Sequence, residues 1–535
     1  MPQQNSGRYP VLIVGGSLVG LSTAMFLAQH GVPAMTVERH PGTAIHPRAG
    51  HLHLRTLELM RSAGLENTLR RLSAERFFPN GGINAMHTLA GGEIATYIPH
   101  LNAGVEEFSP SRRLFVAQDA LEPLLRERAE ELGARLRYGA EVTNLAEHAD
   151  GVTATVRDLT TGREERLEAR YVVGADGNRS PIRRRLGIAM RGHGVLSHSA
   201  TIYFRADCRD LLAGTELGVI YIDNEVLRGF FRFERSGTSG FLAVNTLGDP
   251  RRPGALDVAA GLTRERAAEL VRAAIGVPGM AVEVDDVAQW NATAEVADSY
   301  RRGRIFLAGD AAHVVPPNGG FGGNTGIHDA HNLAWKLAMV VKGDAGEDLL
   351  ATYDAERRPV GRLTIDQAYS RYRHRVTPEL LDNAVPALVD DFTMEIGYRY
   401  HSSAVVAETI DDDGGYLHPR EACGRPGTRA PHVEYAPGVS TLDLFGREFV
   451  LLTADSRWQQ AAAEVALPLR VHSSPTDPAR LSTAYGLGPH GAALVRPDGF
   501  VAWRQRSGAD RTAALRTAFQ SIVSSSPVPA TKRPA

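Results

Sequence analysis

Cysteine is scarce in this chain of 535 residues, which holds only Cys208 and Cys423. The two lie far apart and in no metal-type spacing, so a disulfide framework and a thiol-ligated zinc site are excluded, and a reducing cytoplasm is the expected location. An excess of one charge is also absent, since 59 Lys and Arg stand against 61 Asp and Glu, for a formal net charge of −2. Neither nucleic acid nor an anionic membrane surface is therefore an expected partner.

Long apolar runs are missing as well. After MPQQNSGRYP comes an apolar run of only four residues, too short for a secretory signal. No segment approaches the roughly 20 apolar residues of a membrane span. We therefore expect a soluble, cytoplasmic protein, either a monomer or a homodimer. At roughly 100 to 200 residues per domain, the length predicts about three domains with large cores.

What the chain does contain, near its start, is a glycine-rich turn between two apolar segments. Val11–Val14 is a short apolar run, Gly15-Gly16-Ser17-Leu18-Val19-Gly20 follows it, and apolar residues then recur at helical spacing. Gly31 is a candidate C-cap, Ala34–Val37 is a second candidate strand, and Glu38 ends it 18 residues after Gly20. This order predicts a dinucleotide-binding βαβ unit, with a plain turn as the alternative.

Each part of this unit has a physical reason. The glycines let the backbone approach a pyrophosphate, the helix N-terminus offers free N–H groups, and Glu38 can accept hydrogen bonds from ribose hydroxyls. Ser17 stands where a third glycine is usual, and its small side chain can donate a hydrogen bond. The candidate cofactor contacts in this unit are Gly15, Ser17, Leu18, Gly20, Glu38 and Arg39. The unit alone does not distinguish FAD from NAD.

Two further segments place aspartates at the ends of apolar strands. Tyr171–Gly174 leads into Asp176-Gly177 and a basic helix start, for which a surface turn is the alternative. Farther on, Arg304–Leu307 leads into Gly309-Asp310 and then into a glycine-rich helix start. An aspartate at the end of a buried strand is costly without partners, so we expect Asp310 to accept a hydrogen bond from a ribityl hydroxyl. A structural cap is the rival interpretation.

The glycine-rich stretch after Asp310 predicts an anion-binding helix start. Its free backbone N–H groups form a nest suited to the negative charge that a reduced flavin carries near N1 and O2. Such tuning of a flavin makes FAD the predicted cofactor. The candidate contacts in these two segments are Asp176, Gly309, Asp310, Pro317, Gly322, Gly323 and Asn324.

The three segments, in this order, resemble the group A flavoprotein aromatic hydroxylases, typified by para-hydroxybenzoate and phenol hydroxylases, over residues 9–375. The resemblance implies flavin contacts at Arg48 in His46–Gly50, at Gln118 in Gln118–Glu122, and at Val142. For Arg48 a surface salt bridge is the alternative. The resemblance also implies that Asp176 serves both FAD and NADPH, that NADPH binds only transiently, and that O2 is a co-substrate.

The predicted fold is α/β, and the resemblance implies an FAD-binding Rossmann-like domain of the glutathione reductase type. Its parts are expected at residues 1–185, with substrate-domain insertions around 75–110, and at 291–400. Runs rich in β-branched and aromatic residues predict a β-sheet substrate domain at 186–290. The pattern at 401–535 resembles the thioredoxin-like C-terminal domain of phenol and polyketide hydroxylases, lacks CxxC, and ends in a Ser- and Pro-rich tail expected to be disordered.

In that family NADPH reduces the flavin, O2 adds to form a flavin hydroperoxide, and an electron-rich aromatic carbon attacks its distal oxygen. A neighbouring arginine can lower the pKa of a phenol by roughly one to three units and so favour the reactive phenolate. Arg373, in the basic cluster Tyr369–Arg375, is the candidate for this role, and Tyr221 on a pocket strand is the second catalytic candidate. A basic helix face and a plain core tyrosine are the alternatives.

The overall pattern is most similar to the polyketide hydroxylases of actinomycete antibiotic pathways, and among them to the aklavinone hydroxylases of anthracycline biosynthesis. The resemblance therefore implies a polycyclic phenolic polyketide as the substrate. Four alternatives stay open: oxidative inactivation of an antibiotic, Baeyer–Villiger oxygenation, non-catalytic sequestration of a polyketide by a flavoprotein, and an NAD-dependent dehydrogenase.

Overall fold

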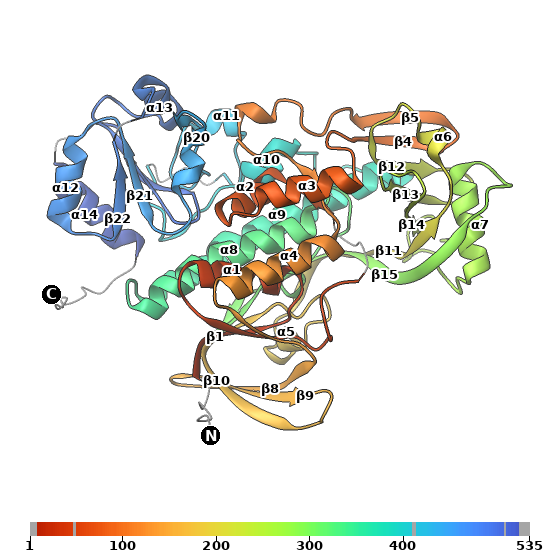
Figure 1. Ribbon diagram of the computed structural model, residues 1–535, viewed down its shortest axis with the longest axis horizontal. Coiled ribbons are helices and arrows are strands. Elements are labelled where there is room, and N and C mark those ends of the chain that lie inside the picture. Colours follow the sequence, from red (N-terminus) through yellow and green to blue (C-terminus); the bar gives the residue numbers. More distant parts are fainter. Residues whose placement is uncertain (1–7, 46–49, 409–413, 474, 508–509, 524–535) are drawn as a thin grey trace.

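Three connected parts make up the computed structural model, which describes residues 8–45, 50–408, 414–473, 475–507 and 510–523 (Figure 1). A sheet with helices stacked on it occupies the middle and lower region, a second sheet lies at the right, and a small α/β unit lies at the left. The fold is α/β, as predicted. Arg48 and the expected C-terminal tail lie outside the described residues.

The first sheet is built around the N-terminal strand. Its strands are β1 (Arg8–Val14), β2 (Ala34–Val37), β7 (Arg135–Arg137), β8 (Ala140–His148), β9 (Gly151–Asp158), β10 (Glu164–Gly174), β16 (Arg301–Arg302) and β17 (Ile305–Leu307). The order is β16-β17-β10-β1-β2-β7, and β9 and β8 extend it from β10. The pairs from β17 to β7 are parallel. Parallel strands are covered on both faces, and Val11, Leu12 and Ile13 are accordingly fully buried.

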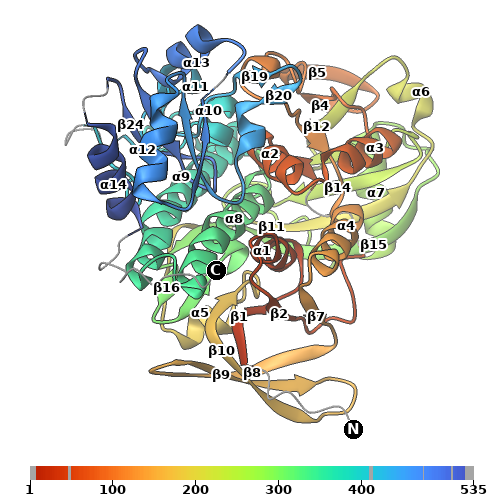
Figure 2. The same ribbon diagram turned by 60° about the vertical axis from the view of Figure 1, so that its left-hand side comes forward.

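Four long helices pack against one another, and the first of them also packs on β1 and β2 of this sheet. They are α1 (Leu18–Gln29), α4 (Gln118–Glu131), α8 (Phe321–Lys342) and α9 (Ala351–Arg375). Helix α1 packs against both α4 and α8, and α8 and α9 run through the middle of the molecule (Figures 1 and 2). Because β10 lies between β1 and β17, the three segments singled out in the sequence follow the carboxyl ends of neighbouring parallel strands. They therefore meet at one edge of the sheet.

The second sheet has eight strands. These are β4 (Gly82–Thr88), β5 (Gly91–Ile98), β11 (Met190–Arg205), β12 (Leu217–Asp223), β13 (Arg228–Phe233), β14 (Ser239–Asn245), β15 (Glu283–Ala297) and β18 (His313–Val314), in the order β18-β15-β11-β14-β13-β12-β4-β5. Residues far apart in the sequence are thus interleaved in it. Helix α7 (Arg264–Ile275) packs with Ile202, Phe231 and Leu242 on the outer face. Tyr221 and Phe230 alternate with these and face the first part, on what we call the inner face.

Short elements connect these parts. They are β3 (His51–Leu52), β6 (Leu114–Phe115), α2 (Leu54–Ser62), α3 (Glu66–Arg76), α5 (Pro181–Arg185), α6 (Arg209–Leu212), α10 (Asp391–Ile396), α11 (Pro419–Ala422), β19 (Glu434–Ala436) and β20 (Val439–Ser440). Strands β3 and β6 pair antiparallel, with His51 opposite Phe115. This pairing fixes the segment after Gly50 beside the second sheet.

The C-terminal unit has the βαβ and β-hairpin arrangement expected of a thioredoxin-like domain. Its elements are β21 (Phe449–Thr453), α12 (Arg457–Val465), β22 (Leu469–His472), α13 (Pro478–Tyr485), β23 (Ala492–Val495), β24 (Val501–Gln505) and α14 (Arg511–Ile522). The sheet order is β22-β21-β23-β24, with β21 and β22 parallel. Cys208 and Cys423 are free thiols.

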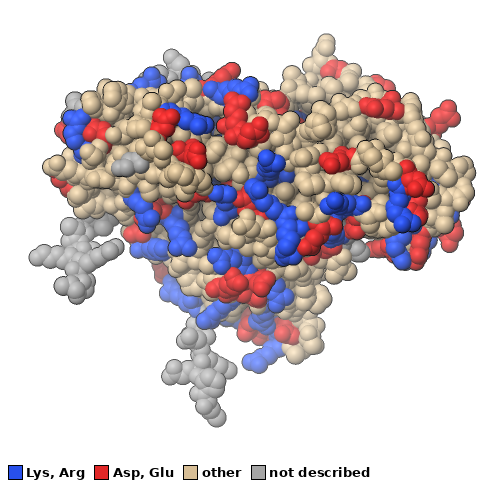
Figure 3. Space-filling view, turned by 45° about the horizontal axis from the view of Figure 1, so that its top comes forward, with Lys and Arg blue, Asp and Glu red and all other residues tan. Residues whose placement is uncertain are grey.

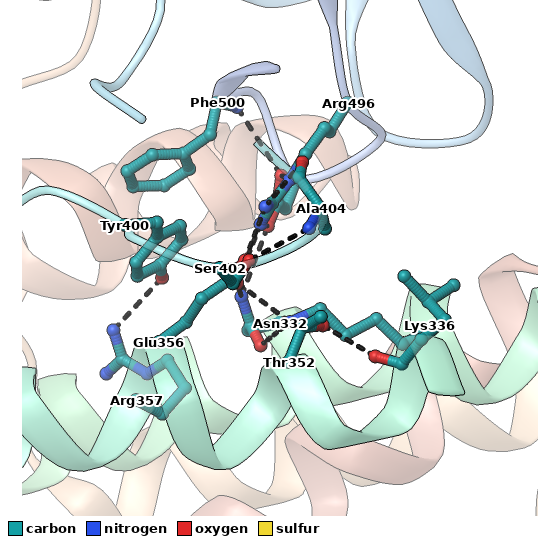
Figure 4. A network of polar contacts seen from close by, with 12 residues as sticks. Asn332, Lys336, Thr352, Glu356, Arg357, Tyr400, Ser402, Ala404, Arg496 and Phe500 are labelled. Carbon is teal, nitrogen blue, oxygen red and sulfur yellow. Dashed lines mark hydrogen bonds and ion pairs between the residues drawn. The ribbon is translucent and has the colours of Figure 1, made fainter. Parts of the chain in front are cut away.

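A buried network of charges joins the C-terminal unit to α8 and α9 (Figure 4). Glu356 of α9 accepts from Lys336 Nζ of α8 at 2.7 Å and from Arg496 Nη1, at the end of β23, at 2.6 Å. Arg496 Nε also donates to Asp498 Oδ1 at 3.0 Å, and these charged side chains are almost completely inaccessible. Buried ions need such partners, so the turn after β23 is fixed to the helix pair.

The surface in Figure 3 carries Lys and Arg interspersed with Asp and Glu, without a large region of one sign on that face. Among the helices of the described residues, none is both long enough and apolar enough to cross a membrane. Even the 25-residue α9 contains many charged residues.

Candidate active site

The glycine-rich turn after β1 is so tight that two of its positions accept only glycine. A Cβ on Gly15, whose φ is +106°, would lie 2.2 Å from the carbonyl oxygen of Ala175, and one on Gly20 would lie 1.8 Å from that of Gly15. Real Cβ atoms do not approach other atoms so closely. The turn therefore brings β1, the start of α1 and the segment after β10 into direct contact, as a dinucleotide-binding unit requires.

Glu38 ends β2 and bonds back to this turn. Its Oε2 accepts from Gly16 N at 2.6 Å, and its Oε1 accepts from His40 N at 2.7 Å. Arg39 beside it is exposed. A buried carboxylate anchored on the glycine turn is well placed for the hydroxyls of a ribose, and that contact stays a prediction.

Glu122 of α4, which the sequence argument did not single out, lies at the N-terminus of α1. Its Oε1 accepts from Leu18 N at 2.9 Å and from the Ser17 hydroxyl, and its Oε2 accepts from Ala44 N at 2.6 Å. Gln118 Nε2 donates to Oε1 at 2.7 Å. The N-terminus of α1 thus binds an anionic group, and a helix start with this property suits a pyrophosphate. The position of Glu122 one helical turn after Gln118 is the signal that could have identified it.

Two aspartates keep carboxyl oxygens that the protein does not use. Asp176 Oδ2 accepts from Ile182 N at 3.1 Å, whereas its Oδ1 is buried without a hydrogen-bond partner among the described residues. Asp310 is exposed, yet desolvation by the surrounding protein raises the pKa of its carboxyl. Buried acceptors without donors are rare, so Asp176 Oδ1 fits a hydroxyl of a bound FAD, and the contact of Asp310 with a ribityl hydroxyl stays a prediction.

Gly309 is held by a buried triad that sequence reasoning missed. Asp329 of α8, fully buried, accepts from Gly309 N at 3.1 Å, from His313 Nε2 at 2.8 Å and from Arg357 Nε at 2.8 Å. A Cβ on Gly309, whose φ is +60°, would lie 2.6 Å from Val19 Cγ2. The Gly309-Asp310 segment is therefore fixed against both α1 and α8. The sequence signal that could have identified the triad is an aspartate, Asp329, on the buried face of α8.

The predicted anion nest lies at the start of α8. Gly319 and Gly320 have φ of +98° and +71°, and the helix begins at Phe321. The N–H groups of its first turn, including those of Gly322 and Gly323, are the free donors of a helix N-terminus. Pro317 before it is exposed. The side chain of Asn324 is committed elsewhere, since its Nδ2 donates to the carbonyl oxygens of His51 and Gly320 at 2.7 Å each, and its backbone remains for a cofactor.

The expected contact at Arg48 lies outside the described residues, but its neighbourhood is visible. Arg232 of β13 donates from Nη2 to the carbonyl oxygen of Gly50 at 3.0 Å. Its guanidinium lies 4.1 Å from the ring centre of Phe77 and 4.7 Å from that of Phe115, and burial lowers its pKa to about 9. Val142 is a half-buried residue near the start of β8, and no contact in the structure singles it out.

The two predicted catalytic residues do not meet. Tyr221 is buried on the inner face, and its hydroxyl accepts from Asn318 Nδ2 at 3.4 Å and from Arg375 Nη1 at 3.5 Å, the long limit of a hydrogen bond. Arg373, also buried, donates instead to the Thr377 hydroxyl at 3.2 Å. Of the basic cluster at the end of α9, Arg375 is thus the arginine beside Tyr221. The turn of the helix decides this, because residues two apart point to different sides.

Comparison with known proteins identifies two family models along the chain. Residues 8–368 match the "FAD binding domain" and residues 423–526 match "Aromatic-ring hydroxylase, C-terminal". The chain is 62% identical over 533 residues to a 4-methyl-5-nitrocatechol 5-monooxygenase of Burkholderia sp., with 96% of this chain and 97% of that protein covered. It is 40% identical to a tetracenomycin A2 monooxygenase-dioxygenase of Streptomyces glaucescens, with 96% of each covered.

Among solved structures, the ternary complex of aklavinone-11 hydroxylase with FAD and aklavinone is similar to this chain with a TM-score of 0.90 and 35% sequence identity. The alignment covers 98% of this chain and 100% of that one. The similarity extends over all three parts of the fold, including the thioredoxin-like C-terminal unit.

Proposed function

The chain belongs to the FAD-dependent aromatic-ring hydroxylases, and we propose that its own reaction inserts one oxygen atom of O2 into an electron-rich phenol or catechol. FAD as the cofactor and a monooxygenase activity agree with the sequence-based predictions. Bound FAD supplies the activation of O2, with electrons drawn from NADPH. The residues of the chain bind the ring, orient it and stabilise its charge.

The observation that carries this proposal is the Tyr221 hydroxyl, which lies between Arg375 and Asn318 on the inner face. The Arg375 guanidinium also lies 4.8 Å from the ring centre of Tyr97. A cation within about 4 to 6 Å of a phenol favours its ionised form. Ionisation increases the electron density of the ring and so its reactivity toward an electrophilic oxygen. Arg375 and Tyr221 are therefore placed to bind and activate a phenolic substrate at this face.

For the substrate we favour a monocyclic catechol bearing a nitro group, because the relative at 62% identity is named for 4-methyl-5-nitrocatechol. The inner face supports a small ring, since Tyr221 packs on both Tyr97 and Phe230 with ring centres 5.8 Å apart. The polycyclic phenolic polyketide expected from the sequence is the second candidate, favoured by the likeness to the aklavinone-11 hydroxylase complex.

The stoichiometry of the reaction tests the first candidate. Oxygen inserted at a ring carbon that bears a nitro group breaks the C–N bond, nitrite leaves with the bonding electron pair, and the ring becomes a quinone. The second oxygen atom leaves as water, with two electrons from NADPH. FAD-loaded protein given 4-methyl-5-nitrocatechol should therefore consume NADPH and O2 and release nitrite in equal amounts.

The other outcomes separate the alternatives. Hydroxylation of aklavinone without turnover of the nitrocatechol would favour the polyketide candidate. A product with oxygen inserted beside a ring carbonyl would indicate Baeyer–Villiger chemistry. Tight binding of phenols with no stimulation of NADPH oxidation would reject the hydroxylase proposal and favour a flavoprotein that sequesters its ligand.

A further inference from the structure

His51 carries a polar atom for which the protein provides no partner. Its Nε2 is buried, and no hydrogen-bond partner for it lies among the described residues. A buried polar atom without a partner is unfavourable, so this nitrogen calls for a ligand that satisfies it. Among the described residues, one other histidine has a buried ring nitrogen without a partner. It is His313, which belongs to the Asp329 triad.

His51 lies where the nest and the inner face meet. Its carbonyl oxygen accepts from Asn324 Nδ2 at 2.7 Å, and its Nδ1 would lie 3.3 Å from a Cβ on Gly320. The backbone is therefore held against the start of α8. The ring also packs on His53 and on Phe115, with centroids 4.7 Å and 5.1 Å away. A Cβ on Gly218, next to the inner-face strand residue Val219, would lie 2.5 Å from that same Phe115 ring.

The phenylalanine thus links the imidazole to the sheet that carries Tyr221. Val219 packs with Phe115 in one apolar cluster, and Tyr221 follows two residues later on the same face of β12. Arg232, on β13, covers the Phe115 ring at 4.7 Å. The orphan nitrogen is consequently one aromatic ring away from the face proposed to bind the substrate.

The groups around His51 keep its imidazole neutral. Burial lowers the pKa of His51 well below its ordinary value, and the nearby His53, Arg113 and Arg232 lower it further. His53 is itself engaged with the carbonyl oxygen of Gly319 at 3.0 Å, and Arg113 is paired with Glu395 at 2.8 Å. His51 is therefore neutral near pH 7, and its Nε2 can accept a hydrogen bond in the tautomer that carries the proton on Nδ1.

We propose that His51 is a substrate-binding residue whose Nε2 accepts a hydrogen bond from a ring hydroxyl of the phenol. The proposal rests on the proposed function, since it requires a phenolic ligand. A hydroxyl group meets the need of this position, because it gives its hydrogen to the imidazole while its oxygen can receive a donor. His51 then selects rings with a free hydroxyl over rings in which that position is an ether.

The test compares ligands with and without the hydroxyl hydrogen on variants with and without the acceptor. The ligands are 4-nitrocatechol and its two monomethyl ethers, and the dissociation constants are measured on FAD-loaded, oxidised protein by the change in flavin absorbance. His51→Phe keeps a ring and removes the acceptor, His51→Gln keeps an acceptor, and His148→Phe, at an exposed position of β8, is the matched control.

We expect the wild type to bind the catechol about 10- to 100-fold more tightly than one of its ethers, which corresponds to one buried hydrogen bond. In His51→Phe this preference should fall to about threefold or less, while His51→Gln and His148→Phe should retain most of it. FAD affinity, measured separately by flavin release, should be unchanged in all variants.

Two results with the His51→Phe variant would overturn the inference. One is an undiminished hydroxyl preference in His51→Phe, and the other is a loss of FAD affinity in that variant with the ligand preference intact, which would assign His51 to the cofactor. If the wild type turns over phenols but shows no hydroxyl preference, only the role of His51 fails. If the wild type neither binds nor turns over any phenol of the panel, the proposed function fails together with it.

Discussion

Glu356→Gln offers the sharpest test of how the C-terminal unit is held on the flavin-binding part. In the native chain the carboxylate accepts from Lys336 Nζ at 2.7 Å, from Asn332 Nδ2 at 2.8 Å, from the Ser402 hydroxyl at 2.6 Å and from Arg496 Nη1 at 2.6 Å. Burial alone would raise the pKa of Glu356, but Arg496 and Lys336 outweigh it and hold this pKa well below its ordinary value.

The size of the effect follows from the charges that remain. A glutamine offers one neutral acceptor oxygen and turns an NH2 group toward donors, so Lys336 and Arg496 are left with Asp498 as the remaining anion of the network. Removing one partner of a buried ion pair costs about 3 to 5 kcal/mol, a change of two to nearly four orders of magnitude in the undocking equilibrium. A matched Glu75→Gln, at a half-exposed pair with Arg71, should cost less than about 1 kcal/mol.

Hydrogen exchange is the suitable assay, because a chain of several parts does not unfold in two states. The amides of Arg496 and Gly499, which donate to Phe500 O at 2.9 Å and Arg496 O at 2.8 Å, report on the turn itself. Their exchange should accelerate at least 100-fold in Glu356→Gln and by less than about fivefold in Glu75→Gln. Equal exchange in the two variants would show that the network does not hold the C-terminal unit.

Three further outcomes are expected. Arg375→Met should lower kcat/KM for hydroxylation about 10- to 100-fold at unchanged FAD content, and a larger loss in Arg373→Met would restore Arg373 as the residue that activates the phenol. Asp310→Ala should lower flavin occupancy, whereas full occupancy with normal turnover would contradict its contact with the cofactor. Burial is the main cause, and Lys342 the second, of a pKa of about 4 for His30. Between about pH 6.5 and 4 the unfolded chain therefore binds a proton at His30, whereas the folded chain does not. Stability should therefore fall by up to about 3 kcal/mol as the pH drops from about 6.5 to 4, and His30→Asn should flatten the profile of melting temperature against pH over that range.

Much of the cofactor site was predictable because its chemistry is local. Gly20 is dictated by its contact with Gly15 inside one contiguous strand, turn and helix, so the glycine spacing alone indicates the unit. Gly15 is also required by its approach to Ala175, which only the folded chain brings close. The α/β fold, FAD and the hydroxylase family followed from three such segments in order, and all are confirmed. The substrate could not be predicted from local patterns in this way. The polyketide prediction is supported only at the level of the family.

The residues that sequence reasoning missed act across long separations. Glu122 reaches Leu18, and Asp329 reaches Gly309 from inside a helix whose sequence reads as an ordinary apolar stripe. His53 N donates to Asn324 Oδ1 at 3.0 Å, although the two residues are 271 positions apart. A sequence pattern cannot predict such a contact.

By itself, the sequence determined the dinucleotide-binding unit and the FAD cofactor, because glycine spacing and strand-end aspartates are imposed by the local geometry of the backbone. Only the tertiary structure decided that Arg375, and not Arg373, lies beside Tyr221, and that the buried His51 Nε2 has no partner among the residues that the structure describes. Those relations depend on how α9, β3 and the second sheet pack together. Packing direction and burial, unlike backbone spacing, are properties of the assembled chain.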